Sequence, residues 1–468
     1  MKLKEIRLKN FRCYEDITIP LDEKLTVLVA PNGMGKTAIL DAISIALWDF
    51  VKKFDLAKPY PAYNISISKD DIRIVKDKTS YNENREEIEK HHRNGGMVRQ
   101  LNTEIIATNT ENFVWMRYKD SETAGSRTKE DRNARLLQEK VTKIQESIRN
   151  LSTHTTELPL FAYYGTGRLW NEKKLMARQK QNKNDEKIRT FAYQNSLDPA
   201  SNYRQFEDWF TEKSNHLTEE LMSLWEYGQH FSDLSKELNL AVSNIQNAVD
   251  IALKIVGWEK PRYSPTFKDI VLIHDEHGTL KLNQLSDGIQ NVFGLVADIA
   301  YRCYLLNSHF GENATNKTEG IVLIDEVDMH LHPEWQQTIL TDLQKAFPKI
   351  QFIVTTHSPQ VLTTVHSECI RIIDGQSVSY APAGSEGAES SRLLNRIFNV
   401  ESRPPQNEVT KLLTEYRKLV YLDKWGNERA LELRCQLDKV FQGNEPELTA
   451  LDLYIDNRKW ELSLEENQ

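Results

Sequence analysis

The chain has 468 residues, of which 39% are hydrophobic and 27% are charged, and its formal net charge is -8. This length allows a large buried core divided into two or three structural parts. The acidic balance excludes a uniformly basic nucleic-acid binder, so any contact with DNA must be regional. The chain has no apolar run as long as a membrane span, and the basic first residues are not followed by a signal-peptide apolar region. We therefore expect a cytoplasmic protein with no membrane partner.

The opening residues 1–28 are rich in strand signals, and the last of these strands leads into a predicted phosphate-binding loop. The apolar run L-T-V-L-V continues directly into A-P-N-G-M-G-K-T, residues 30–37, and apolar residues at helical spacing follow. The order strand, glycine loop and helix is the context that a P-loop needs. Ala30 stands where the pattern GxxxxGK[ST] has its first glycine, a place that another small residue at a strand end can take.

The loop has the chemistry of a nucleotide phosphate site. Its backbone N–H groups and the positive end of the following helix surround an anion, and its glycines allow close approach. Lys36 is expected to contact the β and γ phosphates of ATP, and the Thr37 hydroxyl is expected to bind Mg²⁺. The predicted cofactor-binding residues here are Asn32, Gly33, Gly35, Lys36, Thr37 and Ala38.

A second set of candidates follows the apolar run I-V-L-I, residues 321–324. Asp325 and Glu326 come next, at the carboxyl end of a predicted buried parallel strand, where open α/β sheets bind ligands. One carboxylate serves Mg²⁺ and the other aligns or deprotonates a water molecule. The further buried strand Q-F-I-V-T-T ends in His357, beside the predicted pocket. Between the two strands, Pro333 is predicted to begin a helix that runs to Phe347.

The segment Q-L-S-D-G-I-Q-N, residues 284–291, precedes a long apolar helix through Leu306. Ser286 and Gly288 then lie at the N-terminus of this helix, another end that attracts anions. Taken alone, S-D-G is only a helix cap.

The middle of the chain contains fewer motifs. We expect strands within 102–118, a helix over 132–151, and a strand from Leu158 that ends in a Gly-Thr-Gly-Arg turn at Arg168. Asp198 and Pro199 resemble the start of a helix, and the apolar stripe behind them is predicted to be core rather than a base-stacking platform. Its residues are Phe206, Trp209, Phe210, Leu217, Leu221 and Leu224, and with 240–256 they form a short helical insertion.

Three groups of residues leave alternatives open. Residues 168–189 contain eight Lys or Arg against three Asp or Glu and are the best local candidate for a nucleic-acid backbone, although such runs are more often solvated. Arg168 itself either contacts a phosphate or a neighbouring subunit or is an ordinary surface residue. His330 and His332 form an H-x-H pair with the ligand types of a metal site.

The sequence around the remaining histidines and cysteines indicates no binding or catalytic site. His91 and His92 lack cysteines or carboxylates at ligand spacing and are predicted to be surface imidazoles. The four cysteines lie singly along the sequence, which favours reduced thiols over disulfides or structural zinc. They are Cys13, Cys303, Cys369 and Cys435. After residue 388 the pattern changes to three amphipathic helices, which pack either on the core or against a partner.

Together these motifs resemble ATP-binding-cassette ATPase heads of the RecF, SMC and overcoming-lysogenization-defect type, over about residues 1–380. The matching parts are A-P-N-G-M-G-K-T as Walker A, Q-L-S-D-G-I-Q as the signature, I-V-L-I-D-E as Walker B, V-D-M-H-L-H-P as the D-loop region and T-T-H-S-P as the His switch. The signature departs from LSGGQ at Asp287 and Ile289.

The resemblance implies an α/β P-loop NTPase: an ABC ATPase head with a mixed β-sheet, a helical insertion and a C-terminal helical extension. It implies Asp325 and Thr37 for Mg²⁺, Glu326 as the catalytic carboxylate and His357 as a γ-phosphate sensor. Ser286 and Gly288 would complete the ATP site of a second subunit, giving a homodimer or a higher even-numbered homo-oligomer. The family places the H-x-H segment near the opposite subunit, which we prefer to a metal site.

From these parts we expect an ATPase core made of residues 1–50, 151–170 and 258–385. Residues 51–150 and 171–257 are expected to form an inserted lobe, and residues 386–468 a helical extension that can dock a partner.

More narrowly, Y-Y-G-T-G-R-L-W and the tail that follows E-S-S-R-L-L-N-R-I-F-N-V resemble the PtuA family, the ATPase subunits of Septu anti-phage systems, also found beside some retrons. This resemblance implies a PtuB-like HNH nuclease partner, DNA contact through the complex, and ATP as the regulator. The alternatives are a RecF- or SMC-like DNA-repair ATPase and an overcoming-lysogenization-defect nuclease. The nuclease is disfavoured because its metal-binding domain needs a D-x-D cluster, and none follows residue 360.

Overall fold

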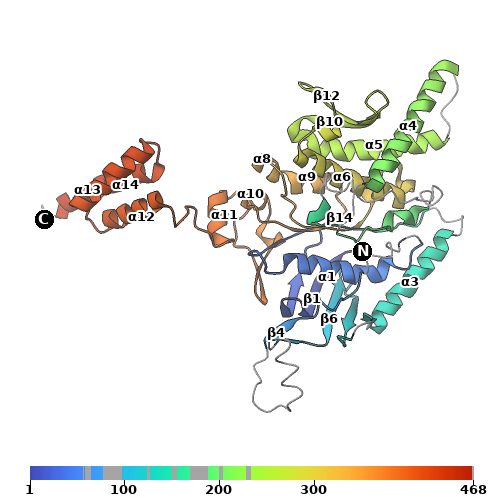
Figure 1. Cartoon of the computed structure of the whole chain (residues 1–468), viewed down its shortest axis with the longest axis horizontal. Coiled ribbons are helices and arrows are strands. Elements are labelled where there is room, and N and C mark those ends of the chain that lie inside the picture. Colours follow the sequence, from blue (N-terminus) through green and yellow to red (C-terminus); the bar gives the residue numbers. More distant parts are fainter. Residues whose placement is uncertain are drawn as a thin grey trace, which may run out of the picture. The chain divides into compact units, whose positions relative to one another are not determined.

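The computed structural model describes residues 1–55, 57, 65–76, 97–123, 127–149, 155–168, 188–199, 204–227 and 233–465 (Figure 1). The predictions for His91 and His92, and for residues 169–187 of the basic stretch, lie outside these residues. The chain divides into two compact units, Met1–Leu393 and Leu394–Gln468. The expected limits of the core, the inserted lobe and the extension stay predictions.

A six-stranded sheet forms the centre of the first unit. Its strands β15, β3, β14, β13 and β9 pair in parallel, and the edge strand β16 pairs antiparallel with β15. Every residue of β3, β9, β13 and β14 is buried, as expected for apolar runs covered on both faces. The order across the sheet is β16 (Ser377–Tyr380), β15 (Ile370–Asp374), β3 (Leu25–Val29), β14 (Ile350–Thr355), β13 (Gly320–Ile324) and β9 (Leu160–Tyr164). The expected mixed α/β sheet is confirmed.

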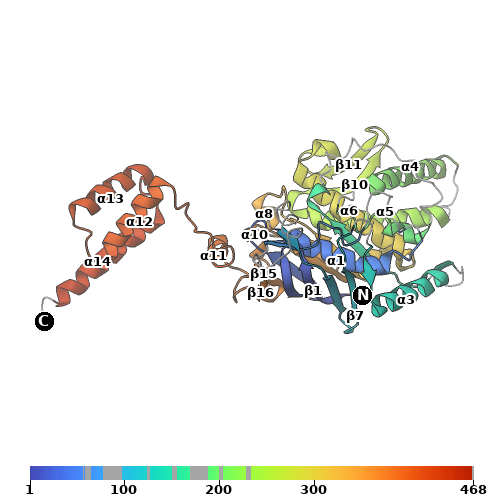
Figure 2. The same cartoon turned by 60° about the horizontal axis from the view of Figure 1, so that its bottom comes forward.

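A second, antiparallel sheet contains the opening hairpin of the chain. Its order is β2 (Tyr14–Pro20), β1 (Leu3–Phe11), β6 (Thr103–Asn109), β7 (Val114–Lys119) and β8 (Lys129–Glu130). Helix α1 (Lys36–Val51) contacts β6 and β7 of this sheet and also β9 and β14 of the first. Figures 1 and 2 both show α1 between the antiparallel sheet and α6. Because α1 is covered from both sides, 13 of its 16 residues are buried. Helix α3 (Arg132–Arg149) contacts α1 and β7.

A helical layer covers the other side of β9. Helix α6 (Asp287–Leu306) contacts β9 and α5 (Asp233–Leu253), and α5 also contacts α4 (Arg204–Tyr227). The described part of the predicted apolar stripe, Phe206, Trp209, Phe210 and Leu217, is buried. The α4 rings pack against α6: the ring centres of Trp209 and Tyr301 lie 4.7 Å apart, and those of Phe206 and Phe293 lie 6.0 Å apart.

Three details of the sequence prediction are wrong. Pro199 lies in a turn, and the described helix begins at Arg204. The helix after Pro333 is divided into α8 (Pro333–Gln336) and α9 (Ile339–Ala346). A strand was also missed, because Pro261 interrupts its pattern: β10 (Trp258–Ser264) joins β11 (Asp269–His274) and β12 (Gly278–Lys281) in a three-stranded sheet.

The second unit is a small helical assembly with its own core. The three predicted helices are present as α12 (Glu408–Tyr421), α13 (Glu428–Phe441) and α14 (Pro446–Glu465). The Asn407 side chain caps α12, and that of Asn427 caps α13. The buried core residues include Leu413, Tyr416, Val420, Leu433, Leu437 and Leu451.

The remaining elements are short. They are β4 (Ile74–Lys76), β5 (Met97–Arg99), α7 (Ala314–Lys317), α10 (Pro359–Leu362) and α11 (Ser390–Arg396), with 3₁₀ turns that include η1 (Thr166–Arg168) and η4 (Arg189–Tyr193). Within the described ranges, every helix is too short or too polar to cross a lipid bilayer.

Candidate functional site: a phosphate loop and two carboxylates

The loop between β3 and α1 has the backbone shape of a phosphate cradle. Gly33 and Gly35 have positive φ angles of 79° and 86°, a region that favours glycine. At Gly35 a Cβ atom would lie 2.5 Å from the Cys13 Sγ, so this position also lacks room for a side chain. Gly35 is the N-cap of α1 and no side chain caps this helix end. The first N–H groups of α1 are therefore available to an anion.

Lys36 already lies along this loop. Its side chain is buried, and its Nζ donates a 2.9 Å hydrogen bond to the carbonyl oxygen of Ala30. Burial lowers the pKa of Lys36, while the nearby carboxylates Asp325 and Glu326 act in the opposite direction. A phosphate would give this ammonium group a charged partner in place of the neutral carbonyl.

The phosphate loop meets the carboxylate strand through one hydrogen bond. The Thr37 Oγ1 donates to the Asp325 Oδ2 over 2.8 Å, and the two residues are 288 positions apart in the sequence. The other carboxylate oxygen of Asp325 accepts a 2.6 Å hydrogen bond from the Thr355 hydroxyl at the end of β14. Asp325 is only 3% exposed, so both bonds are made within the protein interior.

Glu326 follows at a sharp change of backbone direction. Its φ angle is 48°, which is rare for a residue with a long side chain and is commonest at functional sites. Its backbone N–H donates to the Thr355 Oγ1 over 2.8 Å. Thr355 thus contacts both members of the carboxylate pair, and sequence reasoning missed this residue because it reads as an ordinary strand position.

The phosphate loop and the two carboxylates line one cavity of about 400 Å³. Its lining residues are Arg12, Cys13, Asn32, Gly33, Gly35, Lys36, Thr37, Ala38, Asp325, Glu326 and His357. All the Walker A candidates, both carboxylates and His357 are therefore brought together. Burial, and then the charge of Lys36, lower the pKa of His357, which favours its neutral form.

Arg12 and Cys13 were not predicted to belong to the site. They come from the turn between β1 and β2, and Arg12 has a φ angle of 51°. The Arg12 guanidinium donates to Asp41 on α1 at 2.6 Å and to Asp71 at 2.8 Å. The short N-F-R-C-Y stretch carries no local signal for a ligand, because the sheet pairing alone brings this turn to the phosphate loop.

Ser286 and Gly288 lie outside the lining of this cavity. Ser286 is exposed, and its side chain accepts a 3.5 Å hydrogen bond from the Ile289 N–H as the N-cap of α6. Gly288 is buried against the D-loop region: an added Cβ would lie 2.6 Å from the carbonyl oxygen of His330. Gly288 therefore packs beside the D-loop region of its own chain, and neither Ser286 nor Gly288 lines the cavity of that chain.

The H-x-H pair shows no metal-binding arrangement. Among the described residues, no three His, Cys, Asp or Glu side chains come close enough to hold a metal ion together. Asp328, in the same segment, accepts a 2.6 Å hydrogen bond from the Thr356 hydroxyl.

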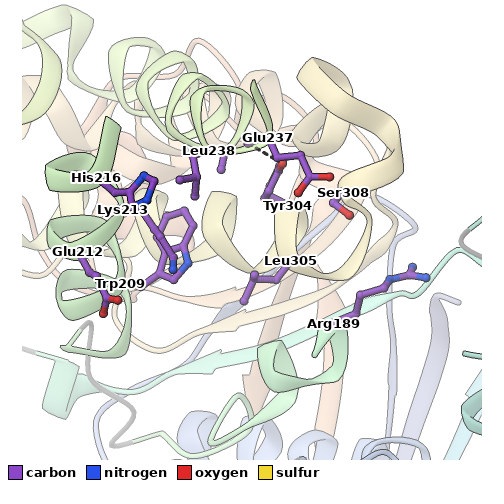
Figure 3. A pocket seen from close by; sticks show the side chains of 11 residues that line it. Arg189, Trp209, Glu212, Lys213, His216, Glu237, Leu238, Tyr304, Leu305 and Ser308 are labelled. Carbon is purple, nitrogen blue, oxygen red and sulfur yellow. Dashed lines mark hydrogen bonds between the residues drawn. The ribbon is translucent and has the colours of Figure 1, made fainter. Parts of the chain in front are cut away.

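Arg189, at the end of the basic stretch, has a structural role. Its guanidinium donates to the backbone carbonyls of Leu306 and Thr156. It also borders a second cavity, of about 480 Å³, between α4, α5 and the end of α6 (Figure 3). Trp209, Leu238 and Tyr304 contribute its apolar surface, and both acidic and basic side chains border it. This cavity contains none of the predicted nucleotide-binding residues. The side chain of Arg168 lies outside the described residues.

The first cavity fits a magnesium nucleotide. Its donor set consists of a hydroxyl and a carboxylate already in contact, Thr37 and Asp325, which are oxygen ligands of the kind that Mg²⁺ prefers. A lysine and a glycine-rich turn at a helix N-terminus lie next to them and suit the phosphates. Parallel strands, a phosphate loop and a carboxylate at the strand ends define the P-loop class of ATPases.

The chain belongs to the AAA ATPase domain family, whose model matches residues 1–362. It is similar to the retron Ec83 probable ATPase of Escherichia coli, with 43% identity over 200 residues, which are 42% of this chain and 36% of that protein. It is also similar to the retron Vc95 probable ATPase of Vibrio cholerae serotype O1 biovar El Tor, with 27% identity over 460 residues, which are 90% of this chain and 84% of the relative.

The similarity to PtuA that the sequence indicated is confirmed. The Septu protein PtuA of Bacillus thuringiensis is 28% identical over 198 residues, which are 40% of this chain and 48% of that protein. The alignments thus span about a third of the E. coli relative and about half of this PtuA.

Proposed function

We propose that this protein binds ATP with Mg²⁺ in the cavity at the phosphate loop and hydrolyses it. The observation that carries the proposal is the 2.8 Å hydrogen bond between Thr37 and Asp325. These two groups would hold a divalent ion, which would neutralise phosphate charge when bound. The backbone of the loop and Lys36 bind the phosphates, Glu326 orients and deprotonates the attacking water, and His357 donates a hydrogen bond to the terminal phosphate.

The second part of the proposal is that two copies form the complete site. Ser286 is exposed at the N-terminus of α6, outside the cavity of its own chain, where it is available to the ATP of a second chain, and the buried Gly288 follows two residues later. An N-terminal helix end stabilises the phosphates of that ATP. ATP then acts as the contact between two heads, and Glu326 sets how long this contact lasts.

The third part places the ATPase in an anti-phage defence complex. The names of the relatives, two retron ATPases and a Septu protein PtuA, support this setting. Within it, the ATP-dependent dimer regulates a PtuB-like HNH nuclease, and DNA is contacted through the complex. This chain itself does not cut DNA.

Two substitutions in the full chain test the proposal. Lys36→Ala removes the phosphate contact and should abolish ATP binding and hydrolysis. Glu326→Gln keeps the shape of the side chain but removes its charge, so ATP should still bind, hydrolysis should stop, and the dimer should accumulate in sedimentation experiments. Wild-type hydrolysis in both variants would refute the site.

The defence role needs its own experiment. The neighbouring open reading frame should encode an HNH nuclease that co-purifies with this chain, and the pair should protect cells from phage only with Lys36 intact. Plasmid nicking by the highly purified ATPase alone, with Mg²⁺ or Mn²⁺, would contradict the proposal that the partner nuclease, and not this chain, cuts DNA.

A further inference from the structure

Two neighbouring tyrosines at the end of β9 connect two helices on opposite faces of the central sheet. The Tyr163 hydroxyl donates a 2.9 Å hydrogen bond to Asp41 of α1, the helix of the phosphate loop. The Tyr164 hydroxyl donates a 2.7 Å hydrogen bond to Asp298 of α6, the helix that begins with the signature. Successive strand residues point to opposite faces, so this pair joins both helices to one strand.

Asp298 belongs to a fully buried ion pair. The Arg302 Nε donates to the Asp298 Oδ2 over 2.7 Å, and each side chain is 1% exposed. Burial is the largest single cause and acts to lower the pKa of Arg302, but the interactions with Asp298, Tyr164 and Tyr301 together raise the net value, so the guanidinium stays charged. Arg302 also donates to the backbone carbonyls of Ala192 and Gln194. Removing one partner of such a pair is costly, because it leaves a buried charge without its counter-charge.

Tyr164 also contacts the carboxylate edge. Its backbone carbonyl accepts a 2.8 Å hydrogen bond from the N–H of Asp325. One residue therefore touches Asp325 through its backbone and the signature helix through its side chain.

Asp298 lies far along α6 from the N-terminal end of this helix. It lies 12 residues beyond Ser286, which corresponds to about 18 Å along a helix. A small rotation of α6 at Asp298 therefore displaces the exposed N-terminus by a larger amount.

We propose that Tyr164 and Asp298 are positioning residues that couple the nucleotide pocket to the signature helix. A change at Asp325 on nucleotide binding shifts the end of β9, and the Tyr164–Asp298 hydrogen bond passes this shift to α6. The coupling sets how Ser286 and Gly288 are presented to a second copy. It deepens the proposed function and rests on it.

Tyr164→Phe tests this coupling, because it deletes one hydroxyl and leaves the backbone contact with Asp325 intact. In the full chain we expect an unchanged dissociation constant for a fluorescent ATP analogue, an unchanged KM and a kcat about tenfold lower. In hydrogen exchange, the ATP-dependent change over residues 286–291 should be lost.

Tyr163→Phe is the matched control on the same strand. Tyr163 is 1% exposed and Tyr164 is 2% exposed, so the two changes remove the same buried group. Tyr163 faces α1, so its loss should alter ATP affinity while the exchange response of residues 286–291 remains.

A merely structural role gives a different result. Wild-type turnover with a normal exchange response in Tyr164→Phe would overturn the coupling, and so would a loss of ATP affinity as large as the loss of turnover. If Tyr164→Phe unfolds at the assay temperature, Asp298→Glu replaces it as the test variant. Asp298→Glu keeps a negative charge for Arg302 while moving the acceptor away from Tyr164, and the same turnover, affinity and exchange measurements then test the coupling.

ATP binding in the cavity and the coupling through Tyr164 have separate tests. A wild-type protein that binds no ATP in the cavity would refute the proposed function. A wild-type protein that hydrolyses ATP normally while Tyr164→Phe behaves identically would refute the coupling alone.

Discussion

The hydroxyl of Thr355 donates a 2.6 Å hydrogen bond to Asp325 and accepts a 2.8 Å hydrogen bond from the backbone N–H of Glu326. One buried side chain at the end of β14 therefore holds the Asp325 carboxylate and the Glu326 backbone at the end of the neighbouring strand β13. It orients the Asp325 carboxylate toward Thr37 and supports the unusual backbone conformation of Glu326.

Thr355→Val should therefore impair hydrolysis while the protein stays folded. Valine has nearly the same shape but leaves a buried carboxylate oxygen and an N–H group without this partner, which costs about 1–3 kcal/mol for each group. We expect ATP turnover to fall at least about tenfold. Steady-state hydrolysis and a melting curve measure the two effects.

Thr26→Val is the matched control for this change. Thr26 is equally buried and lies near the start of β3, at the end of the strand opposite the phosphate loop. Its hydroxyl accepts a hydrogen bond from the backbone N–H of Asp22. It should lower the melting temperature without a selective loss of turnover. Equal turnover in the two variants would show that Thr355 does not position the carboxylates.

The electrostatics of the pocket predict how His357 titrates in the nucleotide-free protein. Burial is the larger cause and the Lys36 charge the second cause of its lowered pKa, so its imidazole should remain neutral at pH values below the usual pKa of about 6.5. Lys36→Met removes the positive charge and should raise the pKa of His357. Lys345→Met removes an exposed lysine of α9 and should leave it unchanged.

A nitrogen-15 NMR titration of the histidine side chains measures these values. An unchanged His357 pKa in Lys36→Met would show that the two side chains do not interact across the cavity.

Gly288→Ala tests the contact between α6 and the D-loop region. An added Cβ would lie 2.6 Å from the His330 carbonyl oxygen, so the backbone must move apart. ATP binding should persist, because Gly288 does not line the cavity of its own chain. Hydrolysis and ATP-dependent dimerisation should both be lost.

Gly426→Ala provides the comparison, because a Cβ at this glycine would meet open space. Its dimerisation and turnover should match those of the wild-type protein. If Gly288→Ala also behaves as wild type, the packing of the signature end against the D-loop region has no part in dimer formation.

The helical unit after residue 394 has a core that is independently testable. Leu433 of α13 is completely buried in this core, and Leu→Ala changes at such sites cost about 2–5 kcal/mol of stability. Leu433→Ala should make this unit sensitive to limited proteolysis in the full chain. Leu431, on the same helix, is 59% exposed, so Leu431→Ala should leave the cleavage rate unchanged. Equal cleavage of both variants would contradict the assigned core.

The sequence by itself determined the parts whose signal is local. The glycine loop, Lys36, Thr37 and the Asp325–Glu326 pair are short motifs between a strand and a helix, and their chemistry depends mainly on residue type and order. The long helices were predictable for the same reason, because hydrophobic periodicity repeats within each segment.

The tertiary structure decided everything that depends on contacts between distant segments. Arg12 and Cys13 reach the cavity through sheet pairing, and the signature end lies outside its own cavity. From a neighbouring strand, Thr355 bridges the Asp325 carboxylate and the backbone N–H of Glu326. The connection from Tyr164 to Asp298 joins residues 134 positions apart. Such contacts leave no periodic or local pattern in a single sequence, because they arise only when the sheet sets the register of its strands and the helices pack on its faces.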